Sequence, residues 1–199
     1  MGKSRIEAFS DGVIAIIITI MVLELKTPHG EEWSALRPLW PTFLSYLLSF
    51  INLAMYWNNH HHMFQAVRLV DGGILWANLH LLFWLSLMPF ATAFMGENQF
   101  APVPVALYAT DLFLCALAYF YLVHRLVGLH GTASEFAESL ASVKTGKLSR
   151  LSYNSKVSLS LISYGVAIPM AFLNQYVSLV LVAAGAAIWF IPDRRFETR

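Results

Sequence analysis

Long apolar runs separated by short polar breaks make up most of this chain of 199 residues. A chain of this length has room for about six helices of roughly 20 residues, the length that crosses the apolar core of a bilayer. An isolated strand in lipid would leave its backbone groups without partners, so a bilayer favours helices. We therefore predict one all-α domain, residues 1–199, with six transmembrane helices at about 8–25, 39–64, 73–95, 103–126, 157–173 and 177–191.

The composition supports a membrane protein. Hydrophobic residues make up 57% of the chain and charged residues 13%, whereas about 25% of a soluble domain is charged. The formal net charge of +1 gives no basic surplus that would indicate a nucleic-acid partner. Cys115, the single cysteine, lies in an apolar run and can form no internal disulfide. We expect no cleavable signal peptide, because no small-residue cleavage site follows the first run.

The basic residues orient the predicted helices. With both termini in the cytoplasm, only Lys26 and Arg37 lie outside, and the other eleven of the 13 Lys and Arg residues lie inside. An odd number of spans would place one terminus on the wrong side of this asymmetry. In the longest polar connection, Thr132 and Glu135 have the spacing that caps a short surface helix.

The first apolar run carries a stripe of small, branched and hydroxyl side chains. At 100° per residue, one face of the helix presents Gly12, Ile16, Thr19, Ile20 and Leu23. Such a stripe is typical of close helix packing, in which a Thr hydroxyl bonds to the carbonyl one turn earlier. The alternative is a pore lined by symmetry-related copies, in which Thr19 forms a polar ring. Periodicity alone does not choose between these structures.

Polar residues at membrane depth form a second set of candidates. Asp11 projects away from the stripe and should face another helix, because an ionised acid in lipid requires a partner. The run His60–His62 at the inner end of the second span is the expected source of that partner. Three successive histidines point in different directions on a helix, so we predict no metal site. A hydrogen-bond cluster with Asp11 and a titratable element that senses pH both remain open.

Asn78 in the third span and Asp111 in the fourth are further buried polar candidates. Hydrogen bonding between helices is their ordinary role, and lining a pathway is the alternative.

Taken together, the segments RIEAFSDGVIAIIITIMVLEL, SFINLAMYWNNHHHMF and NLHLLFWLSLMPFATAF resemble the bacterial transmembrane protein 175 family of potassium channels. The most specific element is Arg-x-x-x-Phe-Ser-Asp, and the match covers the first three spans. The residues that carry the resemblance are Arg5, Phe9, Ser10, Asp11, Trp57, Asn59, His60, His61, Asn78, Pro89 and Phe90.

The resemblance implies a homotetramer of six-helix subunits in which the first helix lines the pore and no carbonyl filter loop exists. Ile16 matches the narrow hydrophobic ring, Thr19 a polar ring above it, and Leu23 an outer ring. Ile20 matches a position that narrows the pore in some members. The polar residues above match a network that holds the first helix in register; its members here are Arg5, Ser10, Asp11, Trp57, Asn59, His60, His61 and Asn78.

The function implied is a potassium-preferring, leak-type cation channel in the plasma membrane of a bacterium. Its partners would be other copies of itself, the bilayer and permeant K⁺; we expect neither a cofactor nor enzymatic activity. Shedding part of the ion's water at Ile16 would favour K⁺ over Na⁺ only modestly, because no carbonyl cage replaces that water. The alternative is a proton-coupled secondary transporter that uses Asp11, Asp111 and His60–His62 as a relay.

Overall fold

The computed structural model describes residues 2–130 and 153–190, and in these residues it contains helices and no strand. The prediction of an all-α fold is confirmed. The predicted cap at Thr132 and Glu135 lies outside the described residues. The elements are α1 (Lys3–Leu23), the 3₁₀ helix η1 (Trp33–Leu39), α2 (Trp40–Ala66), α3 (Gly72–Glu97), α4 (Pro102–His130), α6 (Tyr153–Leu173), α7 (Gln175–Ala187) and the 3₁₀ helix η2 (Ile188–Phe190).

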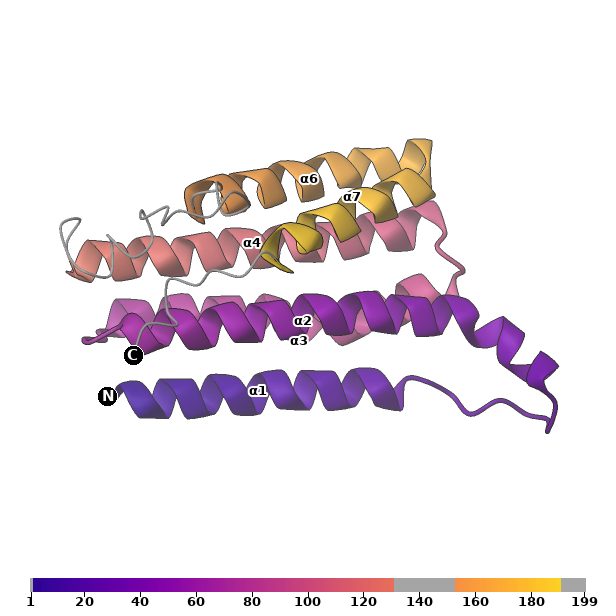
Figure 1. The fold of residues 1–199 in the computed structure, drawn as a ribbon, viewed down its shortest axis with the longest axis horizontal. Helices are drawn as coiled ribbons and strands as arrows, with labels where there is room; N and C mark the ends of the chain where they lie inside the picture. The colour runs from indigo at the N-terminus through magenta and orange to yellow at the C-terminus, as the bar shows by residue number, and fades with distance from the viewer. Residues whose placement is uncertain (1, 131–152, 191–199) are drawn as a thin grey trace.

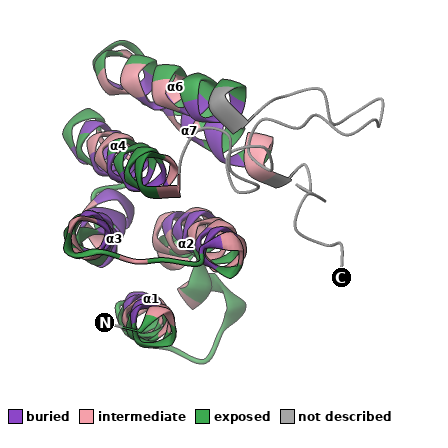
Figure 2. Cartoon of the chain, turned by 90° about the vertical axis from the view of Figure 1, so that its left-hand side faces the viewer, coloured by how far each residue is buried: buried purple, intermediate pink, exposed green. Residues whose placement is uncertain are grey.

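The helices lie side by side and alternate in direction along one long axis (Figure 1). α1 forms one edge of the bundle and packs on α2 and α3, α4 packs on α3, and α6 with α7 forms the opposite edge. α7 runs back toward the end at which α1 begins (Figure 1). α1 buries five residues, whereas α3 buries 12 and α4 buries 14, so α3 and α4 are the central helices and α1 is the peripheral one (Figure 2).

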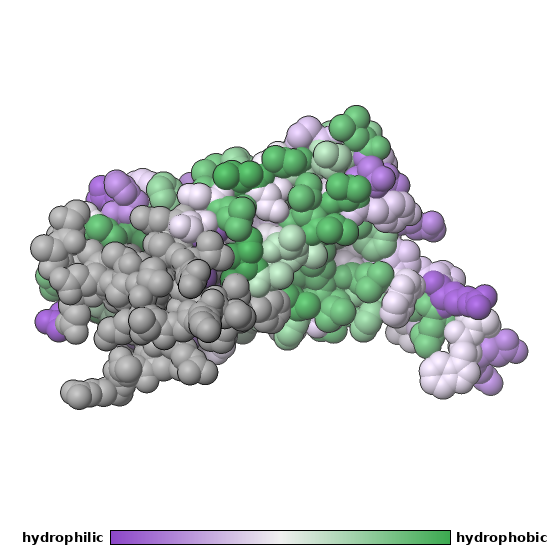
Figure 3. Space-filling model, turned by 45° about the horizontal axis from the view of Figure 1, so that its top comes forward, coloured by the Kyte–Doolittle hydropathy of each residue, from purple (hydrophilic) through white to green (hydrophobic). Residues whose placement is uncertain are grey.

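Five described helices, including α2 with its preceding 3₁₀ turn, are long and apolar enough to cross a membrane. Hydrophobic residues dominate the middle of the surface, and hydrophilic residues gather at the end that carries η1 (Figure 3). The sixth predicted span, 177–191, corresponds to α7 and η2. α7 has 13 residues, and at 1.5 Å per residue it is about 20 Å long, shorter than the roughly 30 Å hydrocarbon core.

Local sequence signals account for several helix ends. Asp71 precedes α3 and accepts a hydrogen bond from the backbone N–H of Ile74 at 2.7 Å, which satisfies one of the free donors of the first turn. Asn174 caps α7 in the same way. α1 begins at Lys3 and α4 continues to His130. Both helices therefore extend past the apolar runs, because polar side chains can continue a helix beyond lipid.

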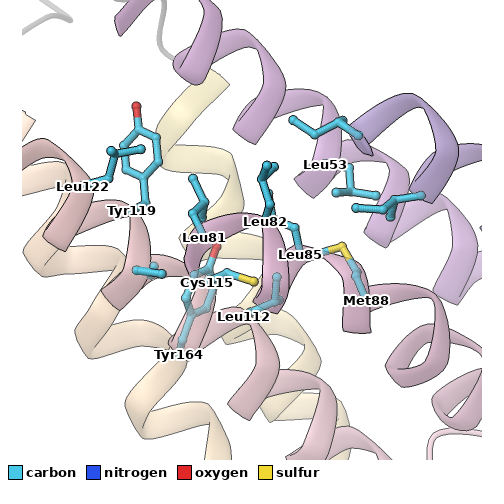
Figure 4. Packing of buried hydrophobic residues seen from close by; sticks show 14 of the residues in the cluster. Leu53, Leu81, Leu82, Leu85, Met88, Leu112, Cys115, Tyr119, Leu122 and Tyr164 are labelled. Atoms are coloured by element: carbon cyan, nitrogen blue, oxygen red, sulfur yellow. The ribbon is translucent and has the colours of Figure 1, made fainter. Parts of the chain in front are cut away.

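The core lies where α2, α3, α4 and α6 meet. Leu53, Leu81, Leu85, Leu112 and Cys115 are fully buried there and interdigitate between the helices (Figure 4).

Close approach of α2 and α3 requires a glycine at position 96. A Cβ atom at Gly96 would lie 2.7 Å from the Cα atom of Thr42, which is backbone and cannot move aside cheaply. The absence of a side chain at position 96 therefore permits the close approach of α2 and α3 near the C-terminal end of α3.

Candidate functional site

One face of α1 is not covered by any of the residues that the structure describes. All five residues of the predicted stripe are exposed. The exposed fraction is 60% for Ile16 and 75% for Leu23. The opposite face, which includes Ile14 and Ile17, is buried against α2 and α3. A continuous exposed apolar face of this kind requires lipid or another copy of the chain to cover it.

Thr19 brings a polar group to this face. Its hydroxyl donates to the backbone carbonyl of Ala15 at 2.8 Å, within the same helix. That bond uses the hydroxyl hydrogen and leaves the oxygen lone pairs facing away from the bundle. The stripe therefore offers an acceptor of the kind that a cation or a water molecule binds.

A buried chain of polar side chains holds the other face of α1. The Asn78 amide on α3 donates from Nδ2 to the hydroxyl of Ser10 on α1 at 3.0 Å. The Nε2 of His60 on α2 donates to Oδ1 of Asn78 at 2.8 Å. All three residues are at most 1% exposed. Because each polar group is costly to bury alone, this chain fixes the rotation of α1 relative to α2 and α3.

A second, more exposed contact ties Asp11 to α2. The indole of Trp57 donates to Oδ1 of Asp11 at 2.9 Å, so Asp11 faces another helix as the sequence predicts. The indole stacks on the His61 ring, with 5.8 Å between centroids. His61 in turn accepts a hydrogen bond from the Gln65 amide at 2.8 Å. The acid at membrane depth is therefore paired with a neutral donor.

The structure differs from the predicted network at three points. Trp57, rather than His60 or His61, donates to Asp11, because residues 57 and 61 share the face of α2 toward Asp11 and the aromatic side chains stack there. Arg5 is exposed, and its side chain has no hydrogen bond or ion pair within residues 2–130 and 153–190. Asn59 lines a pocket between α2, α4 and α6 instead of joining α1.

An ion pair that was not predicted from the sequence lies just after the end of α1. Lys26 donates to Glu97 Oε1 at 2.6 Å, which links the α1–α2 connection to the end of α3. The hydrogen bond from Lys26 to the Glu97 carboxylate raises the pKa of this lysine. The positions lie 71 residues apart in the chain, so only the tertiary structure reveals the pair.

A buried hydroxyl cluster was also missed. The hydroxyl oxygens of Ser49 on α2 and Thr92 on α3 lie 2.6 Å apart, in hydrogen-bond contact. The Ser49 hydroxyl also lies 3.0 Å from the Tyr108 hydroxyl on α4, to which it donates. Hydroxyl residues inside apolar runs were the available signal, but their mutual pairing is not readable from one sequence.

No metal-binding group emerges in the part of the chain that is described. Within it, no three His, Cys, Asp or Glu side chains gather closely enough to hold an ion. The histidines instead bond to amides and pack on aromatic rings. The ring centroids of His60 and Phe64, for example, lie 4.5 Å apart.

Comparisons with known proteins place this geometry in a family. The family model described as endosomal/lysosomal potassium channel TMEM175 matches residues 5–89. A protein named potassium channel, from a Chryseobacterium species, is 48% identical over 197 residues, which are 99% of this chain and 97% of that relative. The chain belongs to the TMEM175 family.

A solved TMEM175 structure shares the fold. The crystal structure of a lysosomal potassium-selective channel TMEM175 homolog from Chamaesiphon minutus matches with a TM-score of 0.77 and 29% identity, over 96% of this chain and 97% of that one. A Gallus gallus protein named endosomal/lysosomal proton channel TMEM175 is 30% identical over 155 residues, 65% of this chain and 30% of the relative. TMEM175 is a family of ion channels rather than enzymes, and the predicted resemblance is confirmed.

Proposed function

We propose that the chain forms a potassium-preferring, leak-type cation channel in the bacterial plasma membrane, as a homotetramer with α1 around the axis. The observation that carries the proposal is the free stripe of α1, whose opposite face is held by Ser10, Asn78 and His60. A face that is apolar, exposed and held in one rotation suits assembly around a symmetry axis. The names potassium channel and potassium-selective channel among the relatives support this function.

In this proposal the stripe selects the ion. Ile16 forms the narrowest ring, Thr19 supplies acceptor oxygens one turn along, and Ile20 and Leu23 continue the apolar wall. K⁺ passes more readily than Na⁺ because it holds its water less tightly. The preference is modest, because side-chain methyl groups replace none of the lost water ligands.

The proposed membrane orientation has both termini in the cytoplasm. It rests on the excess of Lys and Arg in the segments that would lie inside. The alternating direction of the described α-helices supports it, because α7 returns toward the end at which α1 starts (Figure 1).

The reversal potential in a planar bilayer, with KCl on one side and NaCl on the other, tests the proposed function. We expect unitary currents that reverse toward the K⁺ equilibrium potential. Currents without preference for K⁺ would contradict the selectivity. No unitary current from a folded, tetrameric preparation, together with saturable pH-driven flux, would favour the proton-coupled transporter instead.

A further inference from the structure

Asp111 is a buried acid that the proposed conduction path does not use. It lies in the first half of α4, and 6% of the residue is exposed. Neither carboxylate oxygen has a hydrogen-bond partner among the described residues. An ionised carboxylate in this position would lose its water and gain nothing in return, which makes the charged form costly.

No positive charge offsets Asp111 among the residues that the structure describes. The titratable groups near it are the Cys115 thiol and the phenols of Tyr56 and Tyr108, none of which carries a positive charge.

The helices beside α4 supply no ion-pair partner for Asp111 in their described residues. On α2, the titratable residues are Tyr46, Tyr56 and His60–His62, and His60 bonds to Asn78. On α3, His80 and Glu97 are exposed, and on α7 the described segment has no Lys, Arg or His. On α6, Tyr164 is neutral and the Lys156 ammonium lies over the Trp189 ring, 5.8 Å from its centroid. A charge on Asp111 would therefore remain uncompensated.

The surroundings instead suit a neutral carboxylic acid. Tyr56 belongs to α2, and α2 also meets α4 where Ser49 donates to the Tyr108 hydroxyl at 3.0 Å. Asp111 therefore lies on the side of α4 that faces α2. A protonated carboxyl carries no charge and adds a hydrogen-bond donor, so it suits neutral surroundings better than a carboxylate does. The neighbouring core is apolar, with Leu85, Leu112 and Cys115 close together (Figure 4).

We propose that Asp111 is a proton-binding site inside each subunit, separate from the exposed face of α1, and that the bound proton keeps α2 and α4 packed together. The proton comes from water, attaches to one carboxylate oxygen and returns to water when the site empties. α1 packs on α2 and α3, so the site lies behind the helix that carries the proposed conduction face.

Loss of the proton has a structural consequence. It leaves a negative charge in an apolar interface, and that charge is relieved only if water reaches it between α2 and α4. Because α2 also carries Trp57, which donates to Asp11 of α1, the packing behind α1 depends on proton occupancy. This inference goes beyond K⁺ conduction, which needs no proton at Asp111.

Infrared spectroscopy of the purified full-length protein tests the proposal without requiring ion flux. At neutral pH we expect a carboxylic-acid C=O band that shifts in D₂O and disappears as the pH is raised. Asp111→Asn should remove the band, whereas Glu24→Gln, which changes an exposed acid on the α1–α2 connection, should keep it. No such band in the folded wild type, or a band that survives in folded Asp111→Asn, would overturn the proposal.

Thermal unfolding provides a second readout. The Tm of the wild type should fall as the pH rises toward the range in which the band disappears and should level off above it, because the unfolded state releases this proton at a lower pH than the folded state does. The Tm of Asp111→Asn should lack this component of the pH dependence. Equal pH dependence in the wild type and folded Asp111→Asn would contradict the structural role, and if the variant does not fold, the wild-type infrared titration still decides.

Discussion

Single side chains decide which face of α1 is free. Asn78 bonds to Ser10 and His60 in the interior, while Ile16 and Leu23 point away from the bundle. The amide uses both its donor and its acceptor, one toward each neighbouring helix. A side chain that can do only one of these tasks leaves a buried group unpaired.

Replacing Asn78 by Leu should destabilise the fold by about 1–3 kcal/mol for each polar group left unpaired. The Tm in detergent measures this loss, with Trp76→Leu on the exposed face of the same helix as control. In a double-mutant cycle, adding Ser10→Ala to Asn78→Leu should cost less than Ser10→Ala alone. Strict additivity would show that the pair does not act as a unit.

Replacing Ile16 by Asn should lower the K⁺ over Na⁺ permeability ratio toward unity. A polar side chain in the proposed ring supplies oxygen to either ion and removes the dehydration that separates them. Reversal potentials under bi-ionic conditions measure the ratio, and Ile16→Val, which keeps the ring apolar, should stay close to the wild type. An unchanged ratio in a folded Ile16→Asn tetramer would remove Ile16 from the selectivity site.

At the level of elements, short side chains determine how closely helices approach. Gly96 permits the contact between α2 and α3, and the Ser49–Thr92 hydroxyl pair bridges the same two helices. In lipid the hydrophobic effect does not drive helices together, because the lipid tails are as apolar as the side chains. Close packing and hydrogen bonds between helices take its place.

Substituting Gly96 by Ala should therefore destabilise the bundle, by about 1–3 kcal/mol, the usual cost of overpacking a tight site. Gly128→Ala on α4 is the matched control, because a Cβ atom there meets nothing within 4 Å. That control should be neutral or slightly stabilising, since Ala favours a helix more than Gly. Comparable Tm losses in both variants would argue against a specific α2–α3 contact at position 96.

At the level of the whole molecule, α1 is an edge helix whose outer face needs a cover. In the proposed tetramer the stripe faces an aqueous axis; in a monomer it would face lipid. Chemical access to the stripe separates these two environments.

Cysteine substitutions make this comparison clean, because the chain's single cysteine, Cys115, is fully buried. Thr19→Cys should become reactive to a small hydrophilic thiol reagent, and modification should reduce the K⁺ current because the product obstructs the path. Ile162→Cys, on the exposed face of α6, should react slowly because lipid covers it. Equal modification rates at both positions would contradict an aqueous environment for the stripe.

Much of the architecture was readable from the residue pattern. Apolar runs broken by Pro, Gly and charge indicated the helices, the 3.6-residue period identified the stripe on α1, and the Arg-x-x-x-Phe-Ser-Asp motif indicated the family. These features are local, because a helix period assigns side chains to faces without any knowledge of the neighbours.

Pairing between helices was decided only in three dimensions. The donor to Asp11 is Trp57 rather than a histidine. Lys26 pairs with Glu97, 71 residues away in the sequence. Asn59 lines a pocket between α2, α4 and α6, whereas its neighbour His60 bonds to Asn78. Asp111 was visible as a buried acid, but its lack of a partner depends on what three other helices bring near it. A period specifies the direction of a side chain on its own helix; its partner depends on the rotation and register of the next helix, which the packing of the whole bundle sets.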